Sequence, residues 1–230
     1  MALPKIKHPT HSITIPSTQK KVNFRPFTVQ EEKLLLMAKS SEDTDDIINT
    51  VKQVIQNCII EPIDVEKLAI FDIEYIFIKL RAKSVGEVVD LDYTDPENNE
   101  NIKFKINLDD IEVKITEGHT NKFPLFENIG VVMRYPTLEE IKAVEEAGKD
   151  EAVFTMLLKC IDKIYDDDTV YDDYTEKELH DFINTLPMES MTEIQKFFET
   201  MPSVEHTVIL KNKNGETKEV VLKGINSFFT

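Results

Sequence analysis

Glycine is scarce in this chain of 230 residues, and its copies are widely spaced. The six glycines are Gly86, Gly118, Gly130, Gly148, Gly215 and Gly224. A phosphate-cradling loop needs clustered glycines, so that several backbone N–H groups can converge on the phosphate oxygens. The sequence lacks the Walker pattern and the dinucleotide-binding fingerprint, and we expect no nucleotide cofactor.

Cysteine is rarer still, with Cys58 and Cys160 as the two copies. Both fall on the apolar side of a predicted helix, which predicts buried free thiols. Two cysteines make no disulfide framework and fit a reducing compartment. The start, Met-Ala-Leu-Pro-Lys-Ile-Lys-His-Pro, has no apolar run, so we expect no secretory signal. The most hydrophobic stretch, residues 65–80, contains five charged side chains and should not span a bilayer.

Positive charge is both scarce and unevenly placed. The formal net charge is -16, and a nucleic-acid binder normally shows a basic face, so we expect no nucleic-acid partner. Residues 1–30 carry five basic side chains and no Asp or Glu, which leaves -21 for the rest (-16 - 5). This basic arm on an acidic body either docks electrostatically, on its own surface or on a neighbouring subunit, or is a solvated terminus.

No recognisable catalytic or metal-binding pattern occurs. The acidic run that starts at Asp166 resembles the beginning of an EF-hand, but its sixth and twelfth positions are Tyr171 and Lys177 instead of Gly and an acid. Asp72 and Glu74 are two residues apart, so on a helix they point in different directions. The five histidines show no metal-binding spacing, and no Gly-x-Ser-x-Gly elbow is present. We therefore expect neither an enzyme nor a metal or other cofactor.

Hydrophobic periodicity predicts an N-terminal β-hairpin at residues 12–24, a helix from Thr28 to about Lys39 and a second helix from about Thr44. A third helix is predicted from Asp64 to about Lys83. Its charges form two stripes that separate two apolar faces. Either this helix lies at the centre of its domain, or one face meets a partner.

Alternating apolar residues predict a small antiparallel sheet within residues 85–134. Helices return after residue 135, including one with an apolar face from Val153 to Tyr165, and a hairpin around Asn214 and Gly215 closes the chain. Four capping boxes are predicted, with their first residues at Thr28, Thr137, Thr175 and Ser190.

The predicted fold class is therefore α+β. It has an N-terminal β-hairpin and three helices, a small antiparallel sheet in the middle, and C-terminal helices that end in a β-hairpin. The predicted regions are 1–84, 85–134 and 135–230, forming one or two compact domains, and we find no internal repeat in the sequence.

Four segments resemble one known family. They are residues 21–38, 71–87, 194–202 and 222–229, and the most specific blocks are Arg25-Pro-Phe27 and Phe71-Asp-Ile-Glu-Tyr75 with the following Ala82-Lys-Ser-Val-Gly86. Together they resemble the baseplate hub subunit and hub assembly proteins of T4-like, contractile-tailed bacteriophages. The resemblance covers nearly the whole chain.

This resemblance implies a non-enzymatic structural or assembly protein of the phage tail baseplate hub, whose partners are other hub proteins. It implies work in the cytoplasm of the infected host during assembly, with or without a place in the virion tail. It does not decide between a hub component and a transient assembly factor. An enzyme of unrecognised type and a nucleic-acid accessory protein that uses the basic arm are the remaining alternatives.

The resemblance also draws attention to contact residues. Arg25-Pro-Phe27 either fixes a strand-to-helix corner or forms an exposed anchor for a partner. The apolar C-terminus is expected to dock on the last helix or on another subunit. The predicted partner-binding residues are Lys20, Lys21, Arg25, Phe27, Phe71, Tyr75, Phe228 and Phe229.

Overall fold

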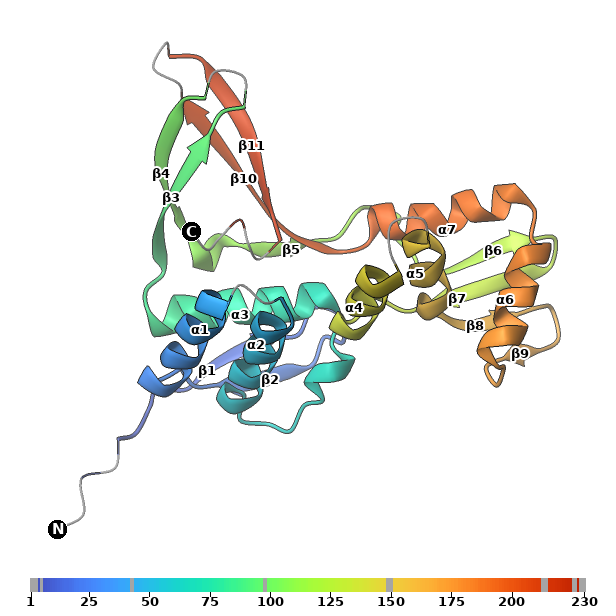
Figure 1. Ribbon diagram of the computed structural model, residues 1–230, viewed down its shortest axis with the longest axis horizontal. Coiled ribbons are helices and arrows are strands. Elements are labelled where there is room, and N and C mark those ends of the chain that lie inside the picture. Colours follow the sequence, from blue (N-terminus) through green and yellow to red (C-terminus); the bar gives the residue numbers. More distant parts are fainter. Residues whose placement is uncertain are drawn as a thin grey trace. The chain divides into compact units, whose positions relative to one another are not determined.

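The computed structural model describes residues 4, 6–41, 44–96, 99–147, 151–211, 215–224 and 227. The chain forms two compact units (Figure 1). Unit 1 combines Met1–Lys114 with Ser203–Thr230, and unit 2 is Ile115–Pro202. The boundaries differ from the seams predicted near residues 84 and 135, because the C-terminal hairpin returns to pair with a strand of the first part.

Unit 1 is built mainly from hairpins and three α-helices. Its elements are β1 (His11–Thr14), β2 (Lys21–Phe24), α1 (Val29–Ser41), α2 (Thr44–Cys58), the 3-10 helix η1 (Val65–Lys67), α3 (Ile70–Ser84), β3 (Val88–Thr94), β4 (Asn101–Asn107), the 3-10 helix η2 (Leu108–Asp110), β5 (Glu112–Lys114), β10 (Ser203–Lys211) and β11 (Thr217–Lys223).

Unit 2 places helices against one antiparallel sheet. Its elements are β6 (Lys122–Phe126), β7 (Ile129–Met133), α4 (Leu138–Ala147), α5 (Ala152–Cys160), β8 (Ile161–Tyr165), β9 (Val170–Tyr171), α6 (Glu176–Thr185) and α7 (Met188–Thr200). The strand order is β6-β7-β8-β9 and every pairing is antiparallel. The described elements of both units confirm the predicted α+β class.

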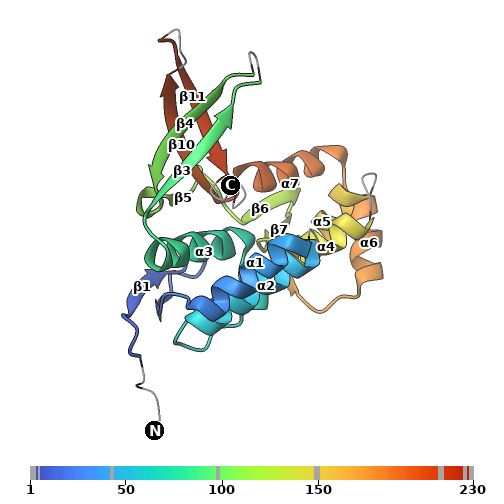
Figure 2. The same cartoon turned by 60° about the vertical axis from the view of Figure 1, so that its left-hand side comes forward.

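The N-terminal hairpin and the first two helices form as the pattern predicts (Figure 2). Ile13 pairs with Val22 across the hairpin, and both side chains are buried. The apolar face of α2 is buried at Val54, Ile55 and Cys58, as its spacing of three and four residues requires. Most other side chains of α2 are exposed or half-buried, so this helix is amphipathic in the usual sense.

Helix α3 is central to unit 1. It buries residues from both predicted apolar faces, including Phe71 and Ile78 on one face and Ile73 and Ile76 on the other. Because both apolar faces are buried within the unit, α3 fits the first alternative, in which the helix lies at the centre of its domain. Its predicted start at Asp64 is wrong: residues 65–67 form the 3-10 turn η1, and the α-helix begins at Ile70.

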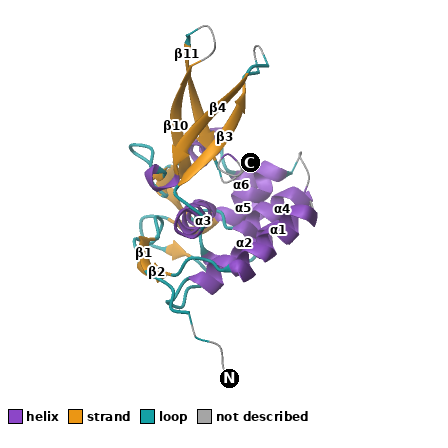
Figure 3. Ribbon diagram, turned by 90° about the vertical axis from the view of Figure 1, so that its left-hand side faces the viewer, coloured by secondary structure: helices purple, strands orange, loops and turns teal. Residues whose placement is uncertain are grey.

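The β3–β4 and β10–β11 hairpins of unit 1 lie close to each other (Figure 3). Each strand alternates, with Leu91 and Ile106 buried on one hairpin and Leu210 and Leu222 buried on the other. An ion pair between Lys218 and Asp95, at 2.7 Å, joins the two hairpins. Strand β5 then pairs with residues 203–205 of β10, which draws the end of the chain into unit 1.

The core of unit 2 contradicts one predicted helix. The apolar residues from Val153 to Tyr165 were expected to form one helical face, but the helix ends at Cys160 and Ile161–Tyr165 is the strand β8. Ile161 and Ile164 are buried in the same core as Leu157. A short apolar run fits a buried helix or a buried strand equally well, and the pairing with β7 decides here.

Three of the four predicted capping boxes are confirmed. In each, the Glu carboxylate accepts hydrogen bonds from the backbone N–H and the hydroxyl of the Thr three residues earlier: Thr28 with Glu31, Thr137 with Glu140, and Thr175 with Glu178. The box at Ser190 is wrong. Helix α7 begins earlier, at Met188, and the buried Ser190 hydroxyl instead donates to the Leu125 carbonyl at 2.8 Å.

Asp72 ties the N-terminal hairpin to the start of α3. Its fully buried carboxylate accepts hydrogen bonds from the Ser17 N–H at 2.9 Å, from the Ser17 hydroxyl, and from the Ala69 N–H at 3.2 Å. A buried N–H group that loses its acceptor retains its full desolvation cost. We expect Asp72→Ala to lower the free energy of unfolding by roughly 2–3 kcal/mol, measured by urea denaturation.

The matched control is Asp64→Ala. The Asp64 side chain is exposed and pairs with Lys67 at 3.4 Å on the surface. Its removal should change the free energy of unfolding by less than about 0.5 kcal/mol. Equal effects of the two substitutions would show that the buried carboxylate does not anchor the hairpin.

Candidate functional site

An ion pair between a half-buried arginine and a buried glutamate joins the first hairpin to the first helix pair. The Arg25 guanidinium donates to Glu31 Oε1 at 2.9 Å, and the same carboxylate closes the capping box of Thr28. The Arg25 backbone N–H donates to the Cys58 carbonyl at 2.9 Å, at the end of α2. Next to it, Phe24 and Ile59 form an isolated antiparallel bridge. Arg25 therefore holds together the end of a strand, the start of one helix and the end of another.

The same arrangement occurs in unit 2. The Arg134 guanidinium donates to Glu140 Oε1 at 2.8 Å, and Glu140 closes the capping box of Thr137. The Arg134 N–H donates to the Cys160 carbonyl at 2.8 Å, and Met133 pairs with Ile161. Each contact of the first site thus has a counterpart in the second.

Each unit therefore contains one copy of a ββαα repeat. The first copy is β1, β2, α1 and α2, and the second is β6, β7, α4 and α5. The shared signature is Arg-x-x-Thr-x-x-Glu followed by a Cys at the end of the second helix. The sequence predicts no internal repeat, and the structure corrects this expectation. Two of the three arginines in the chain belong to this signature, which is the signal that could have revealed it.

The ionisable groups of both sites have shifted pKa values with structural causes. The hydrogen bond from Arg25 lowers the pKa of Glu31 to about 2. Burial opposes the shift at Glu140, but the hydrogen bonds from Arg134 and Thr137 outweigh it and lower that pKa to about 2 as well. Both carboxylates are therefore held ionised, fully engaged and poorly suited to accept a proton from a substrate near neutral pH.

The two cysteines are buried next to these ion pairs. Burial raises the pKa of the Cys58 thiol to about 11 and that of the Cys160 thiol to about 12, although an arginine lies near each. A nucleophilic cysteine needs a lowered pKa and access to solvent. These thiols have neither, and they pack as small apolar side chains, as the sequence predicts.

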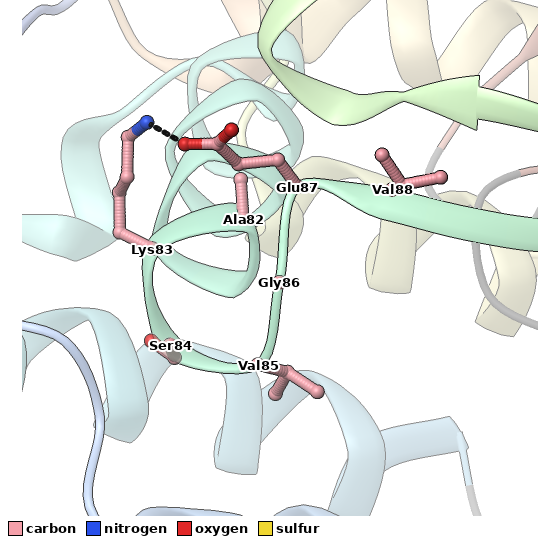
Figure 4. A pocket seen from close by; sticks show the side chains of 7 residues that line it. All are labelled: Ala82, Lys83, Ser84, Val85, Gly86, Glu87 and Val88. Carbon is pink, nitrogen blue, oxygen red and sulfur yellow. Dashed lines mark hydrogen bonds and ion pairs between the residues drawn. The ribbon is translucent and has the colours of Figure 1, made fainter.

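An open hollow on the surface of unit 1 follows the turn between α3 and β3 (Figure 4). Lys83 lies beside it and pairs with Glu87 and with Asp109, each at 2.6 Å. The Ser84 hydroxyl donates to the Leu80 carbonyl and accepts from the Phe27 N–H. The polar side chains that line the hollow, Lys83, Ser84 and Glu87, all bond to other groups of the protein. Within the described part of the chain, no group of three or more His, Cys, Asp or Glu side chains could hold a metal ion.

The predicted partner-binding residues that the structure describes differ in exposure. Lys20 and Lys21 are exposed on the first hairpin. Arg25 is engaged with Glu31, and Phe27 is buried at the corner between β2 and α1, which is the corner-fixing alternative. The structure thus leaves the two lysines as the accessible members of this N-terminal group.

The remaining predicted contact residues lie on α3 and at the C-terminus. Phe71 is 1% exposed and belongs to the core of unit 1. Tyr75 is half-buried, and its hydroxyl donates to Glu112 Oε2 at 3.1 Å. Burial, with Glu112 nearby, raises the pKa of Tyr75 to about 12. Phe228 and Phe229 lie outside the described residues.

The comparison with protein families decides the affiliation of the chain. The model of the family described as T4 bacteriophage base plate protein matches residues 8–230. The chain belongs to the T4 bacteriophage base plate protein family. Searches of curated proteins and of solved structures gave no match. The chain is therefore a phage baseplate protein, and both copies of the ββαα repeat lie within the matched residues.

Acid should weaken this baseplate protein through its two Arg–Glu pairs. Because the folded-state pKa values of Glu31 and Glu140 are lowered from 4.5 to about 2, their contribution is complete above about pH 4.5 and is lost as the pH falls toward 2. We expect a loss on the order of 2–3 kcal/mol per glutamate over that range, measured by urea denaturation.

The control for this prediction is the double variant Glu31→Gln/Glu140→Gln. Burial raises the pKa of Asp72, so this residue makes the folded state more stable as the pH falls, opposite to the effect of the two glutamates. Asp72 is present in both proteins, so its contribution cancels in the comparison. The variant should therefore be less stable at pH 7 and lose less stability on acidification. If the pH dependence were the same in the variant, Glu31 and Glu140 would not be the groups that make the protein less stable in acid.

The thiols offer a second check. In the native protein, Cys58 and Cys160 should react with a thiol-specific reagent such as DTNB only through unfolding, because both side chains are fully buried and their pKa values are raised. In denaturant both thiols should react at once. Rapid labelling of either cysteine under native conditions would contradict the packed environment described above.

Proposed function

We propose that this baseplate protein is a non-enzymatic component of the baseplate hub that acts through contacts with other hub proteins. The family match supports a structural role in the baseplate. The hub assignment rests on the resemblance of four segments, including Arg25-Pro-Phe27 and residues 71–87. Acting among hub proteins also places it in the host cytoplasm during assembly and, as a component, in the virion tail.

The observation that carries the non-enzymatic proposal is how the ionisable groups with shifted pKa values are used. Glu31 and Glu140 are saturated by arginine and threonine, and the two thiols are buried beside them. His119, whose pKa is lowered by burial, contacts Thr200 and Tyr135 through its two ring nitrogens. These groups serve internal packing and do not converge around a hollow. None of the described helices is both long and apolar enough to cross a membrane.

A transient assembly factor is the second candidate. The resemblance includes hub assembly proteins, and the acidic composition with many exposed charges fits weaker, more polar interfaces. Such a factor would bind hub proteins during assembly and be missing from the finished particle. The two candidates share their partners. They differ in whether the protein remains in the finished virion.

Co-expression tests the shared part of this proposal. The chain, carrying an affinity tag, should recover one or more co-expressed hub proteins of the same phage as a complex that survives size-exclusion chromatography. Double charge reversal at the exposed Lys20 and Lys21 should lower this recovery several-fold. The matched control reverses Lys103 and Lys177, which are also exposed. Recovery of no hub protein by the unaltered chain would contradict the proposal.

Mass spectrometry of purified virions separates the two candidates. A hub component should be found at a fixed ratio to the other baseplate proteins. An assembly factor should be present in lysates of infected cells and absent from purified particles. A fixed ratio confirms the component and rejects the transient factor.

A further inference from the structure

Helix α1 shows an apolar surface that the fold of unit 1 does not use. Val29 is 86% exposed, Leu36 is 58% exposed and Met37 is 61% exposed. Val29 and Leu36 are seven residues apart and so lie on the same side of the helix. On the opposite side, Glu31 and Ala38 are buried. A helix with apolar residues on opposite sides normally has both sides covered. We define Val29, Leu36 and Met37 as the α1 patch.

The second copy of the ββαα repeat lacks apolar residues at the positions of Leu36 and Met37. When Thr28 is aligned with Thr137, and Glu31 with Glu140, Leu36 and Met37 correspond to Glu145 and Glu146 in the sequence. The same helix of the same repeat therefore carries two acids in one copy and two large apolar residues in the other. The difference calls for a reason outside the repeat itself, such as a contact with another polypeptide.

The sequence that follows the α1 patch is acidic. The sequence that runs from the end of α1 into the first turn of α2 reads Glu42-Asp-Thr-Asp-Asp46, with four acids in five residues. Asp45 and Asp46 are exposed, as is the apolar Ile47 that follows them. An apolar patch with an acidic border fits a segment whose apolar side chains are flanked by basic ones.

The N-terminal arm of the chain has that composition. It begins Met-Ala-Leu-Pro-Lys-Ile-Lys-His, with Leu3 and Ile6 among Lys5 and Lys7. The Ile6 side chain is 79% exposed, and the described residues 7–10 are exposed as well. The proline at position 4 favours an extended segment, which can lie along a helix without first unfolding.

We propose that the N-terminal arm of one copy of this protein docks on the α1 patch of a second copy. In this proposal, Ile6 and Leu3 of the arm cover Leu36 and Met37, while Lys5 and Lys7 meet Asp45 and Asp46. The basic arm offsets the repulsion between two bodies that each carry a strongly negative charge. This contact is separate from the binding of hub proteins, so it can hold or fail independently of that function.

The test uses a synthetic peptide of residues 1–12 and the chain without residues 1–10, with binding followed by fluorescence anisotropy. Leu36→Glu/Met37→Glu, which installs the residues of the second repeat, should weaken binding at least tenfold. The matched control Ile209→Glu/Val221→Glu adds the same charge at exposed apolar positions of unit 1 and should leave binding unchanged. Because the added acids would strengthen attraction that is only electrostatic, equal or tighter binding to Leu36→Glu/Met37→Glu overturns the proposal.

Two further measurements test whether the α1 patch binds the arm of a second copy. Light scattering after size-exclusion chromatography should show concentration-dependent self-association of the full chain, which is lost on deletion of residues 1–10 and in the Leu36→Glu/Met37→Glu variant. A full chain that stays monomeric at all accessible concentrations overturns the assignment to a second copy. A melting temperature lowered by several degrees in that variant would show that the α1 patch is already buried in the folded chain, which also overturns the proposal.

Discussion

The Arg–Thr–Glu network at the strand-to-helix corner is the interaction on which both units depend. A β-hairpin of short strands is marginal by itself, and a pair of short helices is no better. Arg25 and Arg134 each connect these weak pieces by pairing with a capping glutamate and by a backbone hydrogen bond to the end of the second helix. The corner makes the four elements one cooperative piece.

An ion pair at such a corner specifies geometry at some energetic cost. Burying two charges is expensive unless the pair is close and its remaining hydrogen bonds are made. Here each carboxylate oxygen has a partner, since Oε1 accepts from the arginine and Oε2 accepts from the threonine N–H and hydroxyl. A buried charge that is satisfied in this way can fix where a helix begins relative to the strand before it. That is a structural task, and it accounts for the strongest pKa shifts among the described carboxylates without invoking chemistry.

Much of the fold could be predicted from local patterns. Spacings of three and four residues located α2, alternation located β3, β4 and the final hairpin, and three capping boxes located helix starts. The failures arose where tertiary pairing decides. Ile161–Tyr165 joins a sheet although its apolar residues continue a helical pattern, and Ser190 bonds the Leu125 carbonyl instead of capping a helix. The repeat was hidden because three polar residues and one cysteine carry it, while the apolar positions around them changed.

The predicted contact residues fared unevenly for a similar reason. Phe27 and Phe71 are large and apolar, which makes them equally suited to an interface and to a core, and the structure places both in the core. The α1 patch was not singled out, because a run of leucines within a helix does not by itself show which side faces solvent. Comparing the two copies of the repeat supplies what the pattern lacks, since Leu36 and Met37 stand where the second copy has acids.

The two Arg–Glu sites act as structural joints of the fold, and their equivalence is the central claim. Double-mutant cycles test it most directly, with Arg25→Met and Glu31→Gln in one cycle and Arg134→Met and Glu140→Gln in the other, each followed by urea denaturation. We expect coupling energies of about 1–3 kcal/mol in both cycles. If the coupling at either site were near zero, so that the effects of the two single substitutions simply added, the arginine and glutamate would not act as a pair there. That result would contradict the account.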